Sequence, residues 1–172
     1  MPHPRLDEIR RTYEYKCGYC EVHESEVGSE LTLDHYQPRS ADGTDEVDNL
    51  VYARVKCNQY KGEYWPTTAE KNAGLYVLHP RRHSVTTHLR QNEASAELES
   101  LTNTGAFHVR LLRLNRPPLV AHRLARRAVK IQQQRLLLLE AEATQHEQTI
   151  KELEEYINVL TALVATILRS EH

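Results

Sequence analysis

The sequence predicts an α+β fold in which a small domain of short strands and helices precedes one long helix. All seven Pro and all six Gly residues lie before residue 119, so turns interrupt the first two thirds of the chain. Residues 119–172 are instead rich in Leu, Ala, Glu, Gln and Arg, which favour helix. We therefore expect a core over residues 1–74, an accessory region over 75–118 and a helix over 119–172.

The N-terminal third predicts a helix, a cysteine-bearing turn and a strand, in that order. Residues 6–16 are expected to form a short helix that leads into the turn Cys17-Gly-Tyr-Cys20. Residues 30–36 alternate apolar and polar side chains, as a short strand does. Pro38 and the segment Ala41-Asp42-Gly43 then predict a loop.

A helix is expected to follow this loop. Asp48 is suited to cap the segment Asn49–Lys56, and a short helix should carry Asn58 and Lys61 before Gly62 ends it. In the accessory region, residues 97–101 and 107–111 predict a β-hairpin whose turn is Asn103-Thr104-Gly105.

Apolar residues in the C-terminal helix recur at intervals of three and four. The recurring positions are Ile150, Leu153, Ile157, Leu160, Val164 and Ile167. This spacing, with β-branched residues at the first position of each heptad, is typical of a parallel two-stranded coiled coil. We expect a homodimer through residues 150–168, and the alternative is an intramolecular helix pair with a break near residues 144–149.

Composition restricts the class of protein. Apolar residues make up 40% of the chain, but the longest apolar run, Leu136 to Leu139, is far shorter than the roughly 20 residues of a membrane helix. The N-terminal residues lack the apolar segment of a secretory signal, so we expect a cytoplasmic protein. Three cysteines, two of them in Cys17-Gly-Tyr-Cys20, favour metal binding over a disulfide framework.

Charge is segregated along the chain although its net value is only −2. Residues 21–48 contain nine acidic side chains and one basic side chain, Arg39. The following basic block has no acidic member: Arg110, Arg113, Arg116, Arg123, Arg126, Arg127 and Lys130. Such a block is able to track a phosphate backbone, and the alternative is an ordinary solvated helix face.

Residues 33–62 contain the side chains of a single-metal phosphodiesterase. Asp34 and His35 are followed by Asn49, Asn58 and Lys61 without a long apolar run. Carboxylate and amide oxygens suit Mg²⁺ or Mn²⁺, and an imidazole beside them is able to activate water. The pattern therefore favours a nuclease site.

The same segment resembles the HNH endonucleases, also known as the His-Me finger or ββα-metal family. The elements shared with the family appear in order as Cys17-Gly-Tyr-Cys20, Asp34-His35-Tyr-Gln-Pro38, Asp48-Asn49-Leu50 and Cys57-Asn58-Gln-Tyr-Lys61-Gly62. The resemblance implies a ββα-metal core, and we expect the β-hairpin predicted over residues 97–111 to pack beside it. Downstream segments such as Leu78-His79-Pro80 resemble bacterial free-standing HNH proteins.

The resemblance also implies a role for each site residue. His35 would be the general base that takes a proton from the attacking water. Asp34 and Asn58 would bind the catalytic Mg²⁺ or Mn²⁺. Asn49 would bridge backbone groups of the loop and hold His35, and Lys61 would contact a phosphate, although it is equally well read as a solvated lysine.

One position departs from the family pattern. The family's structural Zn²⁺ takes four cysteines, but here Arg54 stands where the first cysteine of the second pair is expected. The three that remain, Cys17, Cys20 and Cys57, leave zinc one ligand short. Either zinc is lost and Arg54 fills its space, which we favour, or His23 supplies the fourth ligand, or the fold has decayed into a non-catalytic relative.

Two functions follow from these observations. The first is a metal-dependent endonuclease that acts on nucleic acid, with DNA as the expected substrate, and whose basic block binds it. The second is a nucleic-acid-binding or assembly protein that retains an HNH-like fold without cleavage. The intact Asp34, His35 and Asn58 favour the first.

Overall fold

The computed structural model describes residues 3–170 and divides into two compact units. The first unit covers residues 1–124 and contains all the strands of the described chain. The second covers residues 125–172 and is helical over its described part. The predicted α+β class is confirmed, since two small antiparallel sheets accompany the helices.

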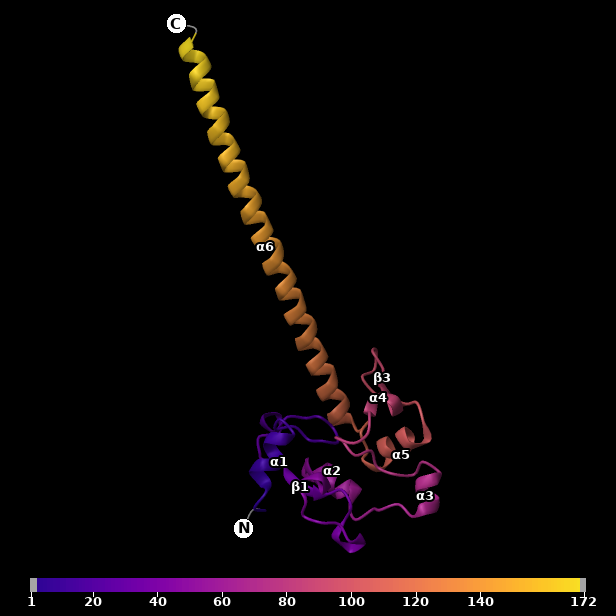
Figure 1. Cartoon of the computed structure of the whole chain (residues 1–172). Coiled ribbons are helices and arrows are strands. Elements are labelled where there is room, and N and C mark those ends of the chain that lie inside the picture. Colours follow the sequence, from indigo (N-terminus) through magenta and orange to yellow (C-terminus); the bar gives the residue numbers. More distant parts are fainter. Residues whose placement is uncertain (1–2, 171–172) are drawn as a thin grey trace. The chain divides into compact units, whose positions relative to one another are not determined.

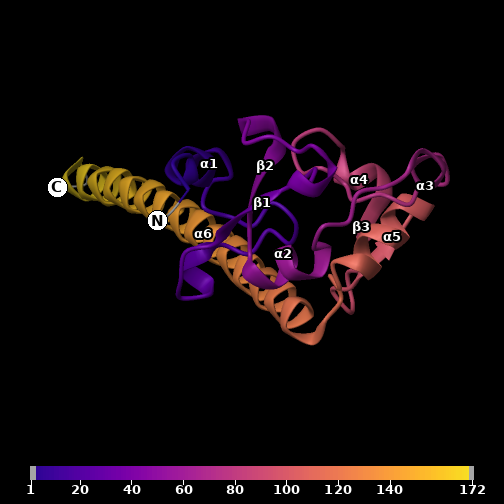
Figure 2. The same cartoon turned by 90° about the horizontal axis from the view of Figure 1, so that it is seen from below.

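The centre of the first unit is a strand–strand–helix arrangement. Strand β1, Thr32–His35, pairs antiparallel with β2, Leu50–Ala53, so that His35 lies opposite Leu50. Helix α2, Val55–Lys61, follows β2 after Arg54 and contacts β1. Figure 2 shows β1, β2 and α2 together in the middle of this unit.

The structure corrects the expected helix start at Asp48. Residues 50–53 form a strand whose four residues are all buried, and the residue that precedes α2 is Arg54. A strand buried on both faces has no apolar–polar alternation, so its short apolar run is not distinguishable from a helical segment by periodicity. The tertiary pairing with β1 decides the conformation.

Shorter elements surround this centre. They are α1, Leu6–Thr12; the 3₁₀ turns η1, Glu24–Glu26, η2, Arg39–Ala41, and η3, Val47–Asn49; and the helices α3, Thr68–Asn72, and α4, Val85–His88. Figure 1 shows these elements with their labels.

The accessory hairpin exists but involves other residues than predicted. Strand β3, Leu89–Gln91, pairs with β4, Leu98–Ser100, whereas the expected second strand lies in helix α5, Asn103–Leu111. The Thr102 hydroxyl caps α5 by accepting from the Gly105 N–H. Gly105 is required by a close approach, because a Cβ there would lie 2.1 Å from the His88 carbonyl oxygen, and it is not a turn residue.

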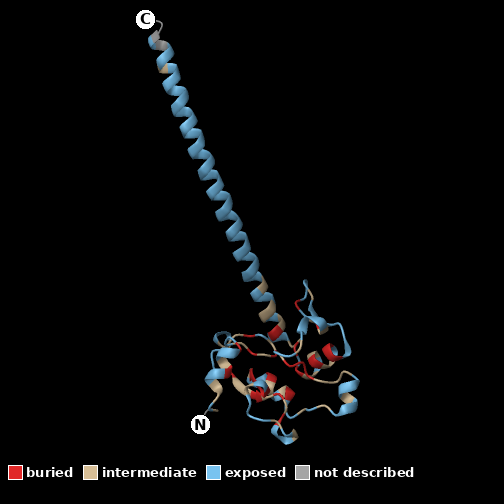
Figure 3. Cartoon of the chain, viewed as in Figure 1, coloured by how far each residue is buried: buried red, intermediate tan, exposed pale blue. Residues whose placement is uncertain are grey.

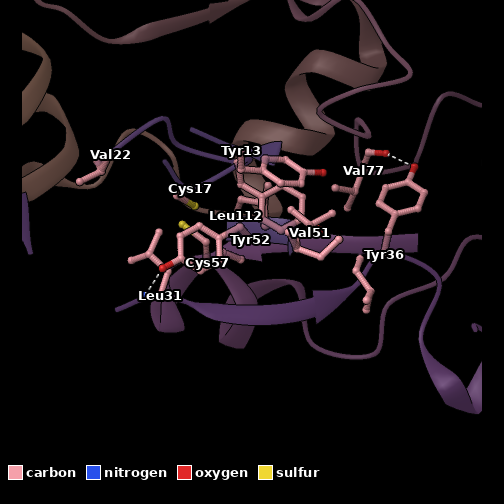
Figure 4. Close-up of a cluster of buried hydrophobic side chains, with 14 of the residues drawn as sticks. Tyr13, Cys17, Val22, Leu31, Tyr36, Val51, Tyr52, Cys57, Val77 and Leu112 are labelled. Carbon is pink, nitrogen blue, oxygen red and sulfur yellow. Dashed lines mark hydrogen bonds between the residues drawn. The ribbon is translucent and has the colours of Figure 1, made fainter. Parts of the chain in front are cut away.

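A hydrophobic core joins these elements, as the buried residues of the first unit in Figure 3 indicate. Its fully buried apolar side chains include Ile9, Leu50, Val51, Tyr52, Leu112, Leu114 and Leu119. Two buried tyrosines bond their hydroxyl groups to the backbone: Tyr52 accepts from the Leu31 N–H, and Tyr36 donates to the Val77 carbonyl (Figure 4). In this core, α1 contacts both β1 and β2, and α2 contacts β1.

Helix α6 runs from Pro117 to Ser170. It continues through residues 144–149, so the alternative of an intramolecular helix pair with a break there is wrong. From residue 125 on, its large apolar side chains are exposed over the described residues, including Leu136 to Leu139 and the heptad positions from Ile150 to Ile167. Within residues 3–170, no helix combines the length and the apolarity that spanning a membrane requires.

Candidate functional site

His35 lies at the end of β1 and is bonded to a carboxylate from the following loop. Its Nε2 is 2.6 Å from Oδ1 of Asp45, and its side chain is 21% exposed. Arg39 Nη2 donates to both oxygens of Asp45, at 2.6 and 2.8 Å. The bonds from His35 and then Arg39 hold the pKa of Asp45 well below its ordinary value, so this carboxylate is ionised.

An ionised carboxylate only accepts hydrogen bonds, which decides the tautomer of the imidazole. The Nε2 atom of His35 therefore carries the hydrogen that points to Asp45. Arg39 Nε also lies 3.3 Å from this nitrogen. Because a protonated Nε2 has no free lone pair, this longer contact is an adjacency and not a hydrogen bond, and Nδ1 is the basic nitrogen.

Asn49 fixes the loop that carries Asp45. Its Oδ1 accepts from the Gln37 N–H at 2.8 Å, and its Nδ2 donates to the carbonyls of Gln37 and Thr44. Gly43 permits the chain to fold closely here, because a Cβ would lie 1.7 Å from the Gln37 carbonyl oxygen. Asn49 thus joins the end of β1 to the residue before Asp45 and has no bond to His35 itself.

Asp34 lies on the opposite side of β1 from His35, as the alternation of side chains along a strand requires. It is 4% exposed and accepts from the Tyr19 hydroxyl and from Lys61 Nζ, at 3.1 Å. Burial raises the pKa of Asp34, although the charge of Lys61 opposes this shift. Both carboxylate oxygens are engaged inside the protein, so Asp34 does not fit the predicted role of metal ligand in this arrangement.

Lys61 is buried as well, with 2% of its surface exposed. Its ammonium donates to Asp34, to the His35 carbonyl at 2.7 Å and to the Gly62 carbonyl. A phosphate contact requires an accessible cation, and the ammonium of Lys61 is buried in this structure, so the predicted phosphate contact requires Lys61 to leave this position. The side chain is the buried counter-ion of Asp34, and it joins the end of α2 to β1.

Asn58 lies on the first turns of α2, beside β1. Its Nδ2 donates weakly to the Leu33 carbonyl at 3.4 Å. The predicted set thus divides between two sides of β1: His35 is partly exposed and lies with Asp45 and Arg39, whereas Asp34 and Lys61 form a buried pair. The oxygens of Asp34 accept from Tyr19 and Lys61, so metal binding by Asp34 and Asn58 together stays a prediction.

The three cysteines converge in the core. The sulfur atoms of Cys17, Cys20 and Cys57 all lie within 4.8 Å of one another, close enough to hold a metal ion. Donation from the Cys17 and Cys20 thiols, and then from Arg116, lowers the pKa of Cys57. Figure 4 shows the sulfurs of Cys17 and Cys57 facing each other.

The surroundings of this group differ from the expected ones. Arg54 donates its backbone N–H to Cys17 Sγ at 3.2 Å, whereas the guanidinium near the sulfurs is that of Arg116, 3.4 Å from Cys57 Sγ. The idea that the Arg54 side chain fills the zinc position has no contact in its favour. His23 caps η1 through Nδ1 and is not part of the sulfur group, so it is not a fourth ligand here.

The residues of the predicted basic block have two kinds of environment. Arg123 donates to the carbonyls of Ala96 and Leu114, and Arg116 donates to the Leu112 carbonyl, so both serve the fold. The remaining members of the block have no such inward bonds and lie at least partly exposed: Arg110, Arg113, Arg126, Arg127 and Lys130.

Sequence reasoning missed Asp45 and Arg39. Both belong to the acidic stretch between residues 21 and 48, where Arg39 is the single basic residue. The sequence feature that could have indicated the ion pair between Arg39 and Asp45 is that Arg39 is the single basic residue among nine acidic ones. The ten-residue separation of His35 from Asp45 is bridged by a loop whose path only the structure supplies.

Comparisons with known proteins agree with this geometry at the level of the domain. Residues 17–63 match the family model described as HNH endonuclease. Neither the curated proteins nor the solved structures contain a match to the chain. The match begins at Cys17 and ends just past α2, so it covers both strands, the His35 loop and the helix. Residues 17–63 of this chain are therefore similar to the HNH endonucleases, as the sequence motifs predicted.

Proposed function

We propose that this chain is a metal-dependent endonuclease that hydrolyses phosphodiester bonds in nucleic acid, with DNA as its substrate and His35 as general base. The observation that carries the proposal is the partly exposed His35–Asp45 pair inside an HNH domain. A purely structural histidine has no need of a partly exposed side chain and an ionised carboxylate together. We place the chemistry in residues 1–74, with 75–118 as support and 119–172 as the helical extension.

His35 acts through its Nδ1 atom. This nitrogen takes a proton from a water molecule, whose oxygen attacks phosphorus. General-base assistance of this kind is worth about 10² to 10⁴ in rate. The carboxylate of Asp45 stabilises the imidazolium that forms.

The reaction is proposed to need Mg²⁺ or Mn²⁺. A divalent cation supplies positive charge at the scissile phosphate when it is bound. Asn58 offers an amide oxygen on α2 for such an ion, and Asp34 does so only if it leaves its pair with Lys61. The cysteine group is a separate candidate metal site, which metal analysis of the purified protein tests.

Nucleic acid is proposed to bind through the exposed part of the basic block. The inward hydrogen bonds that hold Arg116 and Arg123 are absent from the other members of the block, which are Arg110, Arg113, Arg126, Arg127 and Lys130.

The cellular setting is proposed to be cytoplasmic. The three cysteines form no disulfide, which suits a reducing compartment.

The C-terminal helix is proposed to pair with a second copy of the chain. Ile150, Ile157 and Val164 are exposed at one heptad position, and Leu153, Leu160 and Ile167 at the other. Six apolar side chains, each worth about 1.5–3 kcal/mol when fully buried, would be covered on each helix of a parallel pair. Two catalytic domains per particle suit the cutting of both strands of a duplex.

A non-catalytic, nucleic-acid-binding protein is the second candidate. The buried pair of Asp34 and Lys61 favours it, because this pair occupies the carboxylate that the family would use for metal. A cleavage assay separates the two functions.

The assay uses supercoiled plasmid DNA with Mg²⁺ or Mn²⁺ and compares the wild type with His35→Ala. We expect nicked and linear products from the wild type, loss of cleavage in EDTA, and a rate about 10² to 10⁴ lower for His35→Ala. The matched control is His146→Ala, an exposed histidine of α6, which should cleave as the wild type does. Equal activity of His35→Ala and wild type would end the assignment of His35.

A further inference from the structure

We propose that Asp45 is the positioning residue of the site: it fixes the tautomer and orientation of His35 and compensates the charge that this imidazole gains during the reaction. The inference rests on the proposed endonuclease function. It gives the carboxylate role near His35 to a residue that neither the motif nor the family match singles out.

The geometry favours Asp45 for this role over Asp34, the carboxylate that is next to His35 in the sequence. Asp34 is adjacent in the chain, but its oxygens face Tyr19 and Lys61 on the buried side of β1. Asp45 is ten residues away and lies 2.6 Å from His35 Nε2. Its side chain is 51% exposed, so it is not needed to fill the core.

The loop holds Asp45 in place through two separate devices. Arg39 donates to both carboxylate oxygens and so restricts rotation of the carboxylate. Asn49 donates to the carbonyl of Thr44, the residue before Asp45, and fixes the backbone. His3 Nε2, 3.7 Å from the same carboxylate, is a further cation of this group when it is protonated.

These contacts define what Asp45 does in the reaction. Its negative charge keeps the hydrogen of His35 on Nε2, so that Nδ1 presents a lone pair to water. The water proton moves to Nδ1 while the water oxygen forms the new bond to phosphorus. The bond from phosphorus to the leaving oxygen breaks with its electron pair, and that oxygen takes a proton from solvent. During this step the imidazole becomes positive beside the carboxylate, which lowers the barrier.

The experiment compares Asp45→Ala with Asp48→Ala in the full-length protein. Asp48 is a matched control, because it lies in the same loop, its side chain is 79% exposed and its loss changes the charge equally. We expect Asp45→Ala to lower kcat about 10- to 100-fold with little change in KM, as removal of a partner that orients a functional imidazole does elsewhere. Asp48→Ala should retain wild-type kcat.

A second readout does not depend on activity. In ¹⁵N-labelled wild type, the hydrogen on His35 Nε2 should give a slowly exchanging imidazole signal, which His35→Ala identifies. The signal should vanish in Asp45→Ala and persist in Asp48→Ala.

The outcomes separate the two claims. Wild-type kcat in Asp45→Ala, or absence of the Nε2 signal from the wild type, overturns the role of Asp45. Absence of cleavage by the wild type itself overturns the proposed function, while the imidazole signal still decides whether the pair exists. If Asp45→Ala fails to fold, the signal in the wild type remains decisive.

Discussion

At the scale of single residues, the adjacent Asp34 and His35 have unlike surroundings. Strand alternation sends Asp34 into the core with Lys61 and leaves His35 accessible. The sequence pattern treats Asp34 and His35 as one motif, and only their positions on β1 show that one belongs to a buried ion pair and the other is a partly exposed imidazole. Removing one partner of a buried pair leaves an uncompensated charge and typically costs about 3–5 kcal/mol. We therefore assign Asp34 and Lys61 to stability.

Buried histidines predict an acid limit to the stability of the first unit. His108 is 3% exposed, and its Nδ1 accepts from the Leu78 N–H at 3.0 Å. Burial lowers the pKa of His108 to about 4, and burial likewise lowers the pKa of His79 to about 4. Between pH 6.5 and 4 the unfolded chain therefore binds more protons than the folded protein, and stability falls as the pH falls through this window.

Chemical denaturation at pH 7.5 and at pH 4.5 measures this effect. For His108 alone the loss should approach roughly 3 kcal/mol. His108→Leu cannot take up the proton, so the variant should be less stable at pH 7.5, where Leu78 loses its acceptor, but should lose less on acidification. A pH dependence unchanged by His108→Leu would contradict the assignment.

At the scale of elements, sequence periodicity predicted those helices and strands whose conformation depends on interactions within the segment itself. A strand formed at Thr32–His35 within the predicted 30–36, and the long C-terminal helix formed as well, because alternation and helix propensity act within each segment. The predicted helix 6–16 is shorter, Leu6–Thr12, because Glu14 and Tyr15 adopt positive φ. Strand β2 and helix α5 were not predicted. Their conformations depend on the pairing with β1 and on the packing of Gly105 against His88, which are contacts between distant residues.

The exposed heptad positions of α6 lead to a prediction at this scale. Ile157→Asp places a charge in the seam of the proposed helix pair and should convert a dimer to a monomer in light scattering at micromolar concentration. Its matched control is Val159→Asp, because Ile157 and Val159 are both 58% exposed but only Ile157 is a seam position. The control should remain dimeric. Loss of the dimer in both variants would point to a surface other than the heptad seam, and a monomeric wild type would refute the pairing.

At the scale of the whole molecule, acidic and basic residues are segregated along the chain, although the net charge is small. The net charge is −2, yet the basic block between residues 110 and 130 contains no acidic residue. A protein of this composition is expected to bind nucleic acid through local charge, with affinity that falls steeply as salt rises. The net charge of the whole chain does not indicate whether the protein has a local basic surface.

Removing two exposed members of the block should weaken binding and its salt dependence together. For the double variant Arg126→Gln/Arg127→Gln, we expect a lower affinity for duplex DNA and a slope of log K against log salt that is smaller by about 2. Fluorescence anisotropy across a salt series measures both. The control Lys151→Gln lies outside the block on the same helix and should retain the wild-type slope. A slope unchanged in the double variant would remove these arginines from the interface.

The sequence predicted only part of the candidate site. The family motif located the segment that matches the HNH endonuclease model and made His35 a candidate within it, because the spacing of the motif is recorded in the chain itself. It did not reveal that Asp45 faces His35, since a ten-residue loop has many paths. It also did not separate Arg116 and Arg123, which serve the fold, from their exposed neighbours. Burial and partner choice decide these roles, and they arise only after folding.

Asn49 also constrains which sequences are able to build this loop. Its side chain offers an acceptor to one backbone group and donors to two others, all at short reach. Asp lacks the donors, Ser lacks the second branch, and Gln carries the same groups one methylene too far from the backbone. The position therefore admits a single residue type for reasons of stereochemistry. The backbone bonds of the loop thus restrict Asn49 without any contact to a substrate being required.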